Sequence, residues 1–468
     1  MKTRFAPSPT GYLHIGGVRT ALYSWLEAKK NNGTFLLRVE DTDRERSTDE
    51  AVQVILEGMQ WLGLTHDEGP IFQTHRFDRY AEVIDQLLKS GHAYHCYCTR
   101  ERLDQRRAEQ MAAKQKPRYD GHCRGGNCEH DEATPFVIRF KNPLDGDVVI
   151  DDQIKGKVVV SNQELDDLII ARTDGTPTYN LTVVVDDMDM QVTDVIRGDD
   201  HLNNTPRQIN ILRALGAELP NYAHVSMILG PDGQKLSKRH GAVSVLEYRT
   251  EGYLPQALLN YLVRLGWSHG DQEIFTEAEM IEFFDVTNAS NSASTFNPEK
   301  LLWVNQQYIK TMPAEELLEP LQWQFDQAGI DSSNGPSLTT LIETQRDRVQ
   351  TLKEMAEQSR FFYEEFAEYD AKAAKKNLRP VVLEPMLALV AALEALDDWS
   401  AERLNQAIVD SAEKFEMKMG KLALPTRVSV TGGSASPSLD ITLETLGKEK
   451  TLLRLRRGVE FIKNRAEG

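Results

Sequence analysis

The chain has 468 residues, of which 71 are acidic and 54 are basic, and its formal net charge is −17. This length allows several domains with cores of their own, and the absence of any run of about 18 apolar residues predicts a protein without a membrane span. The acidic charge argues against a large nucleic-acid-binding surface, but it leaves room for a local basic track. Because the first residues enter a strand pattern without an apolar signal region, we expect a cytoplasmic protein.

The first residues predict one βαβ unit. A strand is expected at 3–6, followed by a helix in which apolar residues recur with the helical period and which Gly33 ends. The apolar run at 35–39 is typical of a buried parallel strand. The turn before the helix holds His14, Gly16 and Gly17, and a glycine-containing turn at a helix N-terminus favours a phosphate, because its backbone N–H groups are free to bind one. An ordinary helix start is the alternative for so short a motif.

The rest of the chain predicts a nucleotide-binding fold with an insertion and a helical end. Residues 92–190 interrupt the fold, and the apolar run at 181–185 is interpreted as a buried strand that ends in Asp186 and Asp187. From about residue 242 the pattern is almost wholly helical. The other expected elements are helices that begin near 49, 78, 100 and 205 and strands at 136–140, 157–160 and 223–229.

These elements predict the α/β fold class, with a Rossmann-like nucleotide-binding domain, an inserted α+β domain and an all-α C-terminal half. Prolines near 313 and 380 mark breaks in the helical half. The expected domains are 1–91 and 191–241 for the two halves of the nucleotide-binding domain, 92–190 for the insertion, 242–315 for a first helical domain and 316–468 for a second helical region with a break near 380.

The cysteines suggest a metal site. The chain has 4 cysteines, all within a short stretch, and such clustering in an intracellular chain is more typical of metal binding than of a disulfide framework. Four thiolates suit tetrahedral zinc in a structural site, so we predict bound Zn²⁺. His122 and His130 are competing ligands, and free buried thiols are the alternative. The predicted metal ligands are Cys96, Cys98, Cys123 and Cys128.

Two further groups of polar residues point to a ligand site. The loop Lys-Leu-Ser-Lys-Arg at 235–239 places Lys235 and Lys238 after a late strand, where mobile charges suit a triphosphate; a solvated charged turn is the alternative. Arginines could bind a carboxylate in a bidentate manner and Glu40 could bind an ammonium, although each such residue alone more often forms an ordinary ion pair. The candidates for an amino acid with an anionic side chain are Arg4, Ser8, Glu40, Tyr179 and Arg197.

With the helical C-terminal half, the phosphate turn and the lysine loop resemble the class I aminoacyl-tRNA synthetases, and within them the bacterial glutamyl-tRNA synthetases. The turn is similar to the family's His-Ile-Gly-His signature and the loop to its Lys-Met-Ser-Lys-Ser signature. The longer strings at 38–43 (Arg-Val-Glu-Asp-Thr-Asp) and 197–201 (Arg-Gly-Asp-Asp-His) are similar to stretches particular to this synthetase. Gly17 replaces the last histidine of the first signature. Gly125 stands where relatives often have a metal ligand, so Cys128 is the expected substitute and His130 the next choice.

The resemblance implies ATP-dependent, two-step attachment of L-glutamate to tRNA(Glu) through a glutamyl-adenylate. The insertion would then contact the acceptor end of the tRNA, residues 242–315 its stem and residues 316–468 its anticodon, with Arg348 at an anticodon base; the helix-surface ion pair is the alternative for that arginine. We expect a monomer. ATP with Mg²⁺ would bind at His14, Gly16, Gly17, Lys235 and Lys238, and L-glutamate at Arg4, Ser8, Glu40, Tyr179 and Arg197.

Three other functions remain open from the sequence. A small-molecule nucleotidyltransferase shares the phosphate turn, and a glutamyl-queuosine tRNA synthetase-like paralogue shares the chemistry, but both would lack the helical region after about residue 316. A non-catalytic RNA-binding relative would be expected to have lost Lys235 and Lys238, and both are present.

Overall fold

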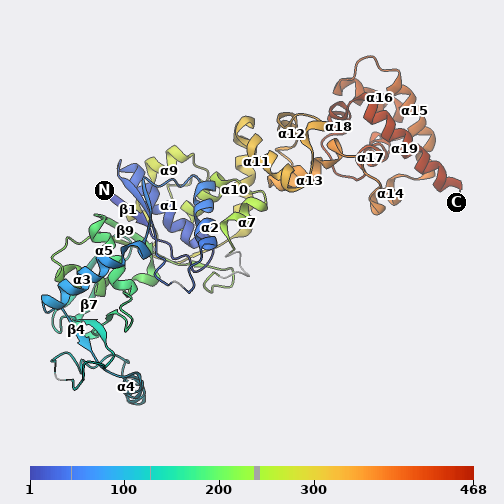
Figure 1. Cartoon of the computed structure of the whole chain (residues 1–468). Helices are drawn as coiled ribbons and strands as arrows, with labels where there is room; N and C mark the ends of the chain where they lie inside the picture. Colours follow the sequence, from blue (N-terminus) through green and yellow to red (C-terminus); the bar gives the residue numbers. More distant parts are fainter. Residues whose placement is uncertain (44, 127, 237–242, 468) are drawn as a thin grey trace. The chain divides into compact units, whose positions relative to one another are not determined.

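The computed structural model describes residues 1–43, 45–126, 128–236 and 243–467 (Figure 1). The chain divides into two compact units, one of Met1–Glu247 with Leu258–Pro298 and one of Tyr248–Ala257 with Glu299–Gly468. The described elements of the first unit are mixed helices and strands, and those of the second are helices. The predicted α/β fold class with a helical C-terminal half is confirmed.

Two sheets form the centre of the first unit. The first has the order β1-β2-β3, all parallel, and the second has the order β7-β6-β10-β9, in which β6, β10 and β9 are parallel. They meet at Lys2, whose carbonyl accepts a hydrogen bond from the Thr193 amide at 3.0 Å. The strands are β1 (Lys2–Phe5), β2 (Thr34–Val39), β3 (Glu68–Phe72), β6 (Asp147–Asp152), β7 (Gly156–Ser161), β9 (Asp194–Gly198) and β10 (Asn221–Val225).

Contacts between the two sheets place β1 beside β9, so that β2 and β3 lie on one side and β10, β6 and β7 on the other. In doubly wound sheets, ligands bind at the carboxyl ends of the strands where the order reverses, which here is the junction of β1 and β9. The remaining strands are β4 (Ala93–Cys96), β5 (Val137–Phe140) and β8 (Ile169–Ala171), which form a third sheet, and the short pair β11 (Ile228–Leu229) and β12 (Ser294–Thr295).

Helices surround these sheets. Helix α1 lies against β1 and β9 (Figure 1). The helices of the first unit are α1 (Ile15–Lys30), α2 (Asp49–Trp61), α3 (Phe77–Lys89), α4 (Arg100–Ala112), α5 (Tyr179–Asp189), α6 (Thr205–Ala214) and α9 (Glu277–Phe283). The chain passes from one unit to the other within α7 (Val245–Thr250), within α8 (Pro255–Arg264) and within α10 (Pro298–Thr311).

Helix α1 shows how local sequence positions the site. The imidazole of His14 caps its N-terminus, because Nδ1 accepts hydrogen bonds from the amides of Gly16 at 3.1 Å and Gly17 at 3.4 Å. At its other end Gly33 lets the chain turn into β2, since a Cβ there would lie 2.4 Å from the carbonyl oxygen of Met1. The prediction that the amides of this turn are free for a phosphate therefore holds only in part, because the imidazole already accepts from two of them.

One predicted element has the wrong secondary structure. The apolar run at 181–185 lies within helix α5 and is not a strand. All five of its side chains are at most 2 % exposed, so this stretch of the helix has no solvent-exposed face, and its β-branched residues imitate the pattern of a buried strand. The consequence for the site is large, because a helix there begins at Tyr179 and ends beyond Asp187.

The second unit is a set of packed helices. Its C-terminal helix packs against α15 and α17, and the fully buried Arg454 on it donates hydrogen bonds to the carbonyls of Phe361 and Val430. No described helix in the chain combines the length and apolar character that crossing a membrane requires. Its helices are α11 (Ala314–Gln327), α12 (Leu338–Gln345), α13 (Leu352–Tyr363), α14 (Ala371–Asn377), α15 (Leu383–Glu394), α16 (Ala401–Glu413), α17 (Met419–Thr431), α18 (Leu439–Leu446) and α19 (Lys448–Glu467).

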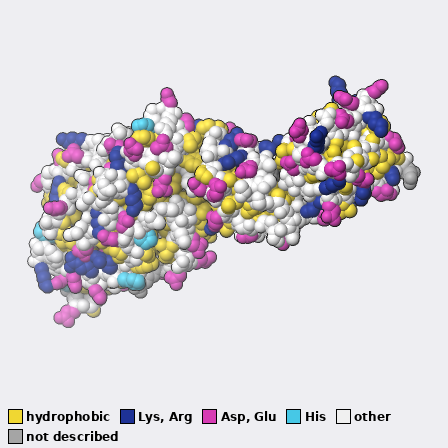
Figure 2. All heavy atoms as spheres, turned by 90° about the horizontal axis from the view of Figure 1, so that it is seen from above, with side chains coloured by type: hydrophobic (Ala, Val, Ile, Leu, Met, Phe, Trp, Pro, Cys, Tyr) yellow, Lys and Arg dark blue, Asp and Glu magenta, His cyan; other side chains and the backbone are white. Residues whose placement is uncertain are grey.

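The surface carries both signs of charge. Figure 2 shows acidic and basic side chains interspersed over the visible face of the molecule. The net charge of −17 is therefore not gathered into one acidic region on that face.

Candidate active site

A cavity of about 400 Å³ opens in the first unit at the carboxyl ends of β1 and β9 and at the N-terminus of α1. This is the position that the reversal of strand order predicts for a ligand. Lys238 lies outside the described residues. The residues proposed from the sequence that line the cavity are Arg4, Ser8, His14, Gly16, Gly17, Glu40, Tyr179, Arg197 and Lys235.

His14 presents a proton donor to this cavity. Because Nδ1 accepts from the backbone amides of α1, the ring proton of the neutral imidazole resides on Nε2. Burial lowers the pKa of His14, and the charge of Lys235 acts in the same direction, so the ring is neutral near pH 7. The absence of a Cβ at Gly16 leaves room for the ring, since a Cβ there would lie 3.0 Å from its Cε1 atom.

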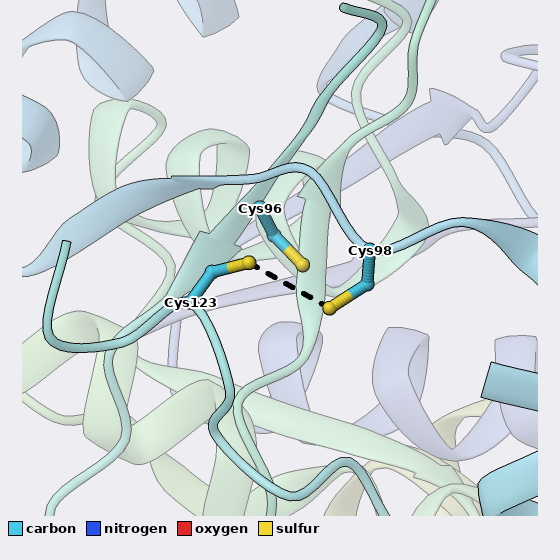
Figure 3. Close-up of side chains that lie close together, drawn as sticks. All are labelled: Cys96, Cys98 and Cys123. Carbon is cyan, nitrogen blue, oxygen red and sulfur yellow. Dashed lines mark hydrogen bonds between the residues drawn. The ribbon is translucent and has the colours of Figure 1, made fainter. Parts of the chain in front are cut away.

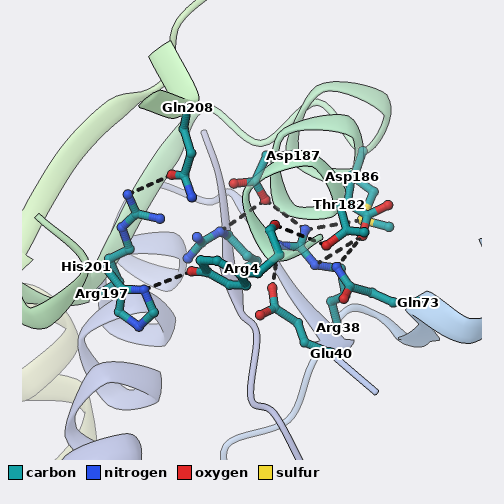
Figure 4. Close-up of polar contacts among 12 residues, drawn as sticks. Arg4, Arg38, Glu40, Gln73, Thr182, Asp186, Asp187, Arg197, His201 and Gln208 are labelled. Atoms are coloured by element: carbon teal, nitrogen blue, oxygen red, sulfur yellow. Dashed lines mark hydrogen bonds and ion pairs between the residues drawn. The ribbon is translucent and has the colours of Figure 1, made fainter. Parts of the chain in front are cut away.

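A buried ion-pair network lies next to the cavity (Figure 4). Arg4 Nε donates to Asp187 Oδ1 at 3.2 Å, and Arg38 NH1 donates to the same oxygen at 2.7 Å. Arg38 NH2 also donates to Glu40 Oε1 at 3.1 Å. The fully buried Arg38 therefore contacts Glu40 directly and is linked to Arg4 through Asp187. The sequence predicted both Glu40 and Arg4 as ligand-binding residues.

Two carboxylates of this network, Asp187 and Glu40, differ in how their charge is stabilised. Burial acts to raise the pKa of Asp187, but Arg4 and Arg38 outweigh it and hold the pKa below its usual range. Burial raises the pKa of Glu40 despite the same two arginines. Asp187 is thus the balanced counter-ion of the arginines, whereas the charge of Glu40 is incompletely compensated and would be stabilised by a cation in the cavity.

Tyr179 and His201 form a second polar pair at the cavity. The Tyr179 hydroxyl lies 2.8 Å from His201 Nδ1, and both side chains line the cavity. Burial raises the pKa of Tyr179 to about 12. Burial, and after it the charge of Arg197, lowers the pKa of His201 to about 4, so both groups are neutral near pH 7.

Arg197 is held rigidly but keeps one nitrogen free. Its NH2 donates to Thr205 Oγ1 and to Gln208 Oε1, each at 2.8 Å, and its Nε donates to His224 Nε2 at 3.2 Å. Its NH1 is buried and has no hydrogen-bond partner in the described part of the chain. A buried guanidinium nitrogen without an acceptor is costly to maintain unless a ligand supplies one.

The sequence did not nominate three residues that the structure adds to the site. Arg38 and His201 lie in the two strings that carried the family resemblance, so their position was a usable signal. Asp187 was placed at the end of a predicted strand, and the wrong element type concealed that it faces Arg4.

Three of the predicted metal ligands lie together. The sulfur atoms of Cys96, Cys98 and Cys123 lie within 4.8 Å of one another (Figure 3). Cys128 is paired with Cys123 in a disulfide, and a disulfide sulfur is not a thiolate, so the predicted set of four thiolates is not formed in this state. The imidazole of His130, the alternative ligand, instead stacks on Tyr97 with ring centroids 3.8 Å apart.

Arg348 lies in the second unit, after α12, and its side chain is exposed. No carboxylate pairs with it among the described residues, so the alternative of a helix-surface ion pair does not describe it. The nearby Arg427 is instead a like charge: burial, and after it the charge of Arg348, lowers the pKa of Arg427.

Comparison with known proteins identifies the family. The family described as "tRNA synthetases class I (E and Q), catalytic domain", where E and Q denote glutamate and glutamine, matches residues 1–303. The chain belongs to this class I tRNA synthetase family. A second family, described as "Anticodon binding domain", matches residues 314–459 of this synthetase.

Solved structures extend the likeness over the whole chain. The synthetase is 34 % identical to a glutamate tRNA ligase from Elizabethkingia meningosepticum CCUG26117, solved in complex with its amino acid, with a TM-score of 0.86 and 99 % of each chain covered. It is also 34 % identical to the glutamate-tRNA synthetase of Elizabethkingia anophelis, with a TM-score of 0.82 and with 98 % of this chain and 99 % of that chain covered. The resemblance inferred from the sequence is confirmed.

Proposed function

We propose that this synthetase is a glutamate–tRNA ligase, which joins L-glutamate to tRNA(Glu) in two steps. The observation that carries this proposal is the pair of buried arginines, Arg4 and Arg197, at one cavity beside the incompletely compensated Glu40. Two cations and one anion match a ligand with two carboxylates and one ammonium, which means glutamate or aspartate, and the likeness to glutamate tRNA ligases favours glutamate. The free NH1 of Arg197 supplies a donor for one of those carboxylates.

In the first step the α-carboxylate of glutamate attacks the α-phosphate of ATP. The bond from that phosphorus to the bridging oxygen breaks, pyrophosphate leaves, and glutamyl-adenylate remains. Mg²⁺ bound with ATP would neutralise phosphate charge. His14 would donate a hydrogen bond from Nε2 to a phosphate oxygen. Lys235 would stabilise the negative charge that develops on pyrophosphate as it leaves. From the sequence, we propose the same role for Lys238.

In the second step a ribose hydroxyl of the terminal adenosine attacks the activated carbonyl carbon. An ester forms, the hydroxyl proton passes to a phosphate oxygen of the departing AMP, and AMP leaves with the electron pair of the broken bond between the carbonyl carbon and the anhydride oxygen. Neither step needs a protein nucleophile, so the residues of the cavity act by positioning and by stabilising charge.

The cavity favours glutamate over glutamine for a physical reason. The amide nitrogen of glutamine would turn donor hydrogens toward a guanidinium that has only donors itself. A buried donor left without an acceptor lowers affinity strongly, which is how a site rejects an analogue of the same shape.

We also propose the assignments of the tRNA-binding regions. Residues 92–190 would contact the acceptor end and residues 242–315 the stem, while the helical region after 316 would read the anticodon. The exposed Arg348 supports the last assignment, because the like charge of Arg427 lies near it and no carboxylate pairs with Arg348 among the described residues, which suits an RNA backbone or base. We propose that the protein acts as a monomer in the cytoplasm.

The cysteine group fits a structural zinc ion in its reduced form. Three sulfurs lie close enough for one ion, and thiolates are the preferred zinc ligands. Reduction of the disulfide would free Cys123 and return Cys128 to the list of candidate fourth ligands. Bound zinc would tie the strand end at Cys96 to the loop at Cys123.

The function is tested by measuring glutamate-dependent exchange of pyrophosphate into ATP, with and without tRNA(Glu), and by following the charging of that tRNA. We expect exchange with glutamate only when the tRNA is present, and no exchange with glutamine. Exchange that needs no tRNA, or no charging at all, would contradict the proposal. The two catalytic alternatives, the nucleotidyltransferase and the queuosine paralogue, are not favoured, because the anticodon-binding match occupies the region that both would lack.

A further inference from the structure

Behind the cavity, Arg197 rests on a relay of two buried residues that do not line the cavity themselves. Arg197 Nε donates to His224 Nε2 at 3.2 Å, and His224 Nδ1 lies 2.5 Å from Asp152 Oδ2. His224 and the carboxylate of Asp152 are both fully buried. The three residues come from the neighbouring strands β9, β10 and β6 in that order.

The relay fixes where the proton of the imidazole is. The Asp152 carboxylate also accepts from the backbone amides of Ile154 at 3.0 Å and Lys155 at 2.8 Å, so it is held in place as an acceptor. Burial acts to raise the pKa of Asp152, but the hydrogen bond from His224 and these amides outweigh it and keep the pKa below its usual value. An ionised Asp152 accepts a hydrogen bond from Nδ1–H, so the ring proton of the neutral imidazole stays on Nδ1 and Nε2 keeps its lone pair.

That lone pair is what the guanidinium of Arg197 requires. All nitrogens of Arg197 are donors, so an Nε2–H facing it would set donor against donor. Burial lowers the pKa of His224, and Arg197 lowers it further against the opposing effect of Asp152, so the ring is neutral near pH 7. The Thr205 hydroxyl accepts a hydrogen bond from Arg197 NH2 and lies 2.9 Å from His224 Nε2, so it contacts both residues.

We propose that Asp152 and His224 are positioning residues for the glutamate site, which hold Arg197 in the orientation that leaves its NH1 for the substrate carboxylate. Asp152 acts by selecting the Nδ1–H tautomer of His224, and His224 acts by presenting Nε2 to Arg197. This inference rests on the proposed function, because it assigns Arg197 to glutamate.

The first experiment measures KM and kcat of tRNA charging for Asp152→Asn. An asparagine amide can donate to Nδ1 and so stabilise the wrong tautomer, and we expect KM for glutamate to rise about tenfold or more while KM for ATP is unchanged. The matched control is Asp194→Asn, because Asp194 is 4 % exposed like Asp152 and, from β9, accepts from Asn221 Nδ2 on β10 at 2.9 Å. An unchanged KM for glutamate in Asp152→Asn, or an equal rise in the control, would overturn the inference.

A second variant separates positioning from folding. In His224→Gln the side-chain carbonyl can accept from Arg197 without needing a tautomer, so we expect KM for glutamate to stay within about threefold of the wild type. Adding Asp152→Asn to His224→Gln should then cause little further change. Equal effects of Asp152→Asn in both backgrounds would show that Asp152 acts otherwise than through His224.

A spectroscopic measurement needs no active variant. In ¹⁵N-histidine-labelled wild-type protein, the His224 signals, identified by their loss in His224→Gln, should show a protonated Nδ1 and an unprotonated Nε2 at pH 7.5. A protonated Nε2 would overturn the inference. Failure of the proposed function would look different, since the wild type would then charge no tRNA with glutamate whatever the tautomer of His224.

Discussion

Arg4 donates a hydrogen bond from Nε to Asp187 Oδ1 at 3.2 Å, across 183 positions in the chain. Both side chains are more than nine-tenths buried. The contact joins the first strand to the end of α5, and the same oxygen of Asp187 also receives Arg38. One carboxylate oxygen therefore balances two guanidinium groups that the rest of the site depends on.

Replacing Asp187 by Asn should destabilise the first unit. Two buried arginines would lose their main counter-charge, and breaking such a pair costs about 3–5 kcal/mol of unfolding free energy. Urea unfolding followed by circular dichroism measures the change. Asp85→Asn removes an exposed pair with Lys89 and serves as the control; a similar loss in both variants would contradict the role of Asp187.

Lys235→Ala should slow adenylate formation about a hundredfold, because the pyrophosphate would leave without this charge at the cavity. The measurement is tRNA-dependent pyrophosphate exchange at saturating substrates. Affinity for tRNA, measured separately by filter binding, should be retained. A normal exchange rate would remove Lys235 from the chemical step.

Stability should depend on pH through His201. Its pKa is about 4 in the folded protein against an ordinary 6.5, so between these values the unfolded chain binds a proton that the folded chain does not. The contribution of the neutral His201 to the free energy of unfolding is therefore fully present above pH 6.5, and it is lost as the pH falls toward 4. His201→Gln should lose less stability than the wild type between pH 7 and 5 in urea titrations. His92→Gln, an exposed histidine, controls for the loss of an imidazole; a wild-type pH dependence in His201→Gln would refute the assignment.

Protein purified with a reductant should contain about one zinc ion per chain, measured by atomic emission. Cys96→Ser should abolish most of the binding, because that sulfur belongs to the close group of three. The Cys128→Ser variant distinguishes two cases. Loss of zinc from this variant would show that Cys128 is a ligand, and retention of zinc would show that Cys128 serves only as the disulfide partner of Cys123 in the oxidised protein. Reduced protein without zinc would refute the site.

Arg348→Ala should raise KM for tRNA about tenfold, which corresponds to one lost charged contact, and should leave KM for ATP and glutamate unchanged. Arg379→Ala removes another arginine of the helical region, one that follows α14, and provides the comparison. An equal effect of the two substitutions would mean that charge alone, and not position, explains the result.

The sequence predicted those parts of the fold that depend on neighbours in the chain. The βαβ unit at the N-terminus follows from periodicity and from the glycine at 33, and both act locally. Helix α5 was mistaken for a strand because its surroundings, and not its own pattern, make it a helix buried on all sides. Periodicity cannot indicate such an element.

The site was predicted as a set of residues but not as a geometry. The sequence predicted that Arg4 and Arg197 bind the ligand. The residues next to them in the chain do not show that Arg4 donates a hydrogen bond to Asp187 or that Arg197 donates one to His224. Those partners lie 183 and 27 positions away. Their convergence is a property of the sheet order, which a single sequence does not reveal.

The bond between Lys2 and Thr193 also concerns how the chain is made. The two residues are 191 positions apart, so the first strand emerges from the ribosome long before its neighbour exists. At about 5–20 residues per second it waits for on the order of 10–40 s with that edge unpaired. During translation this edge of the first strand therefore stays unpaired, and unpaired strand edges are the part of a nascent sheet most exposed to aggregation.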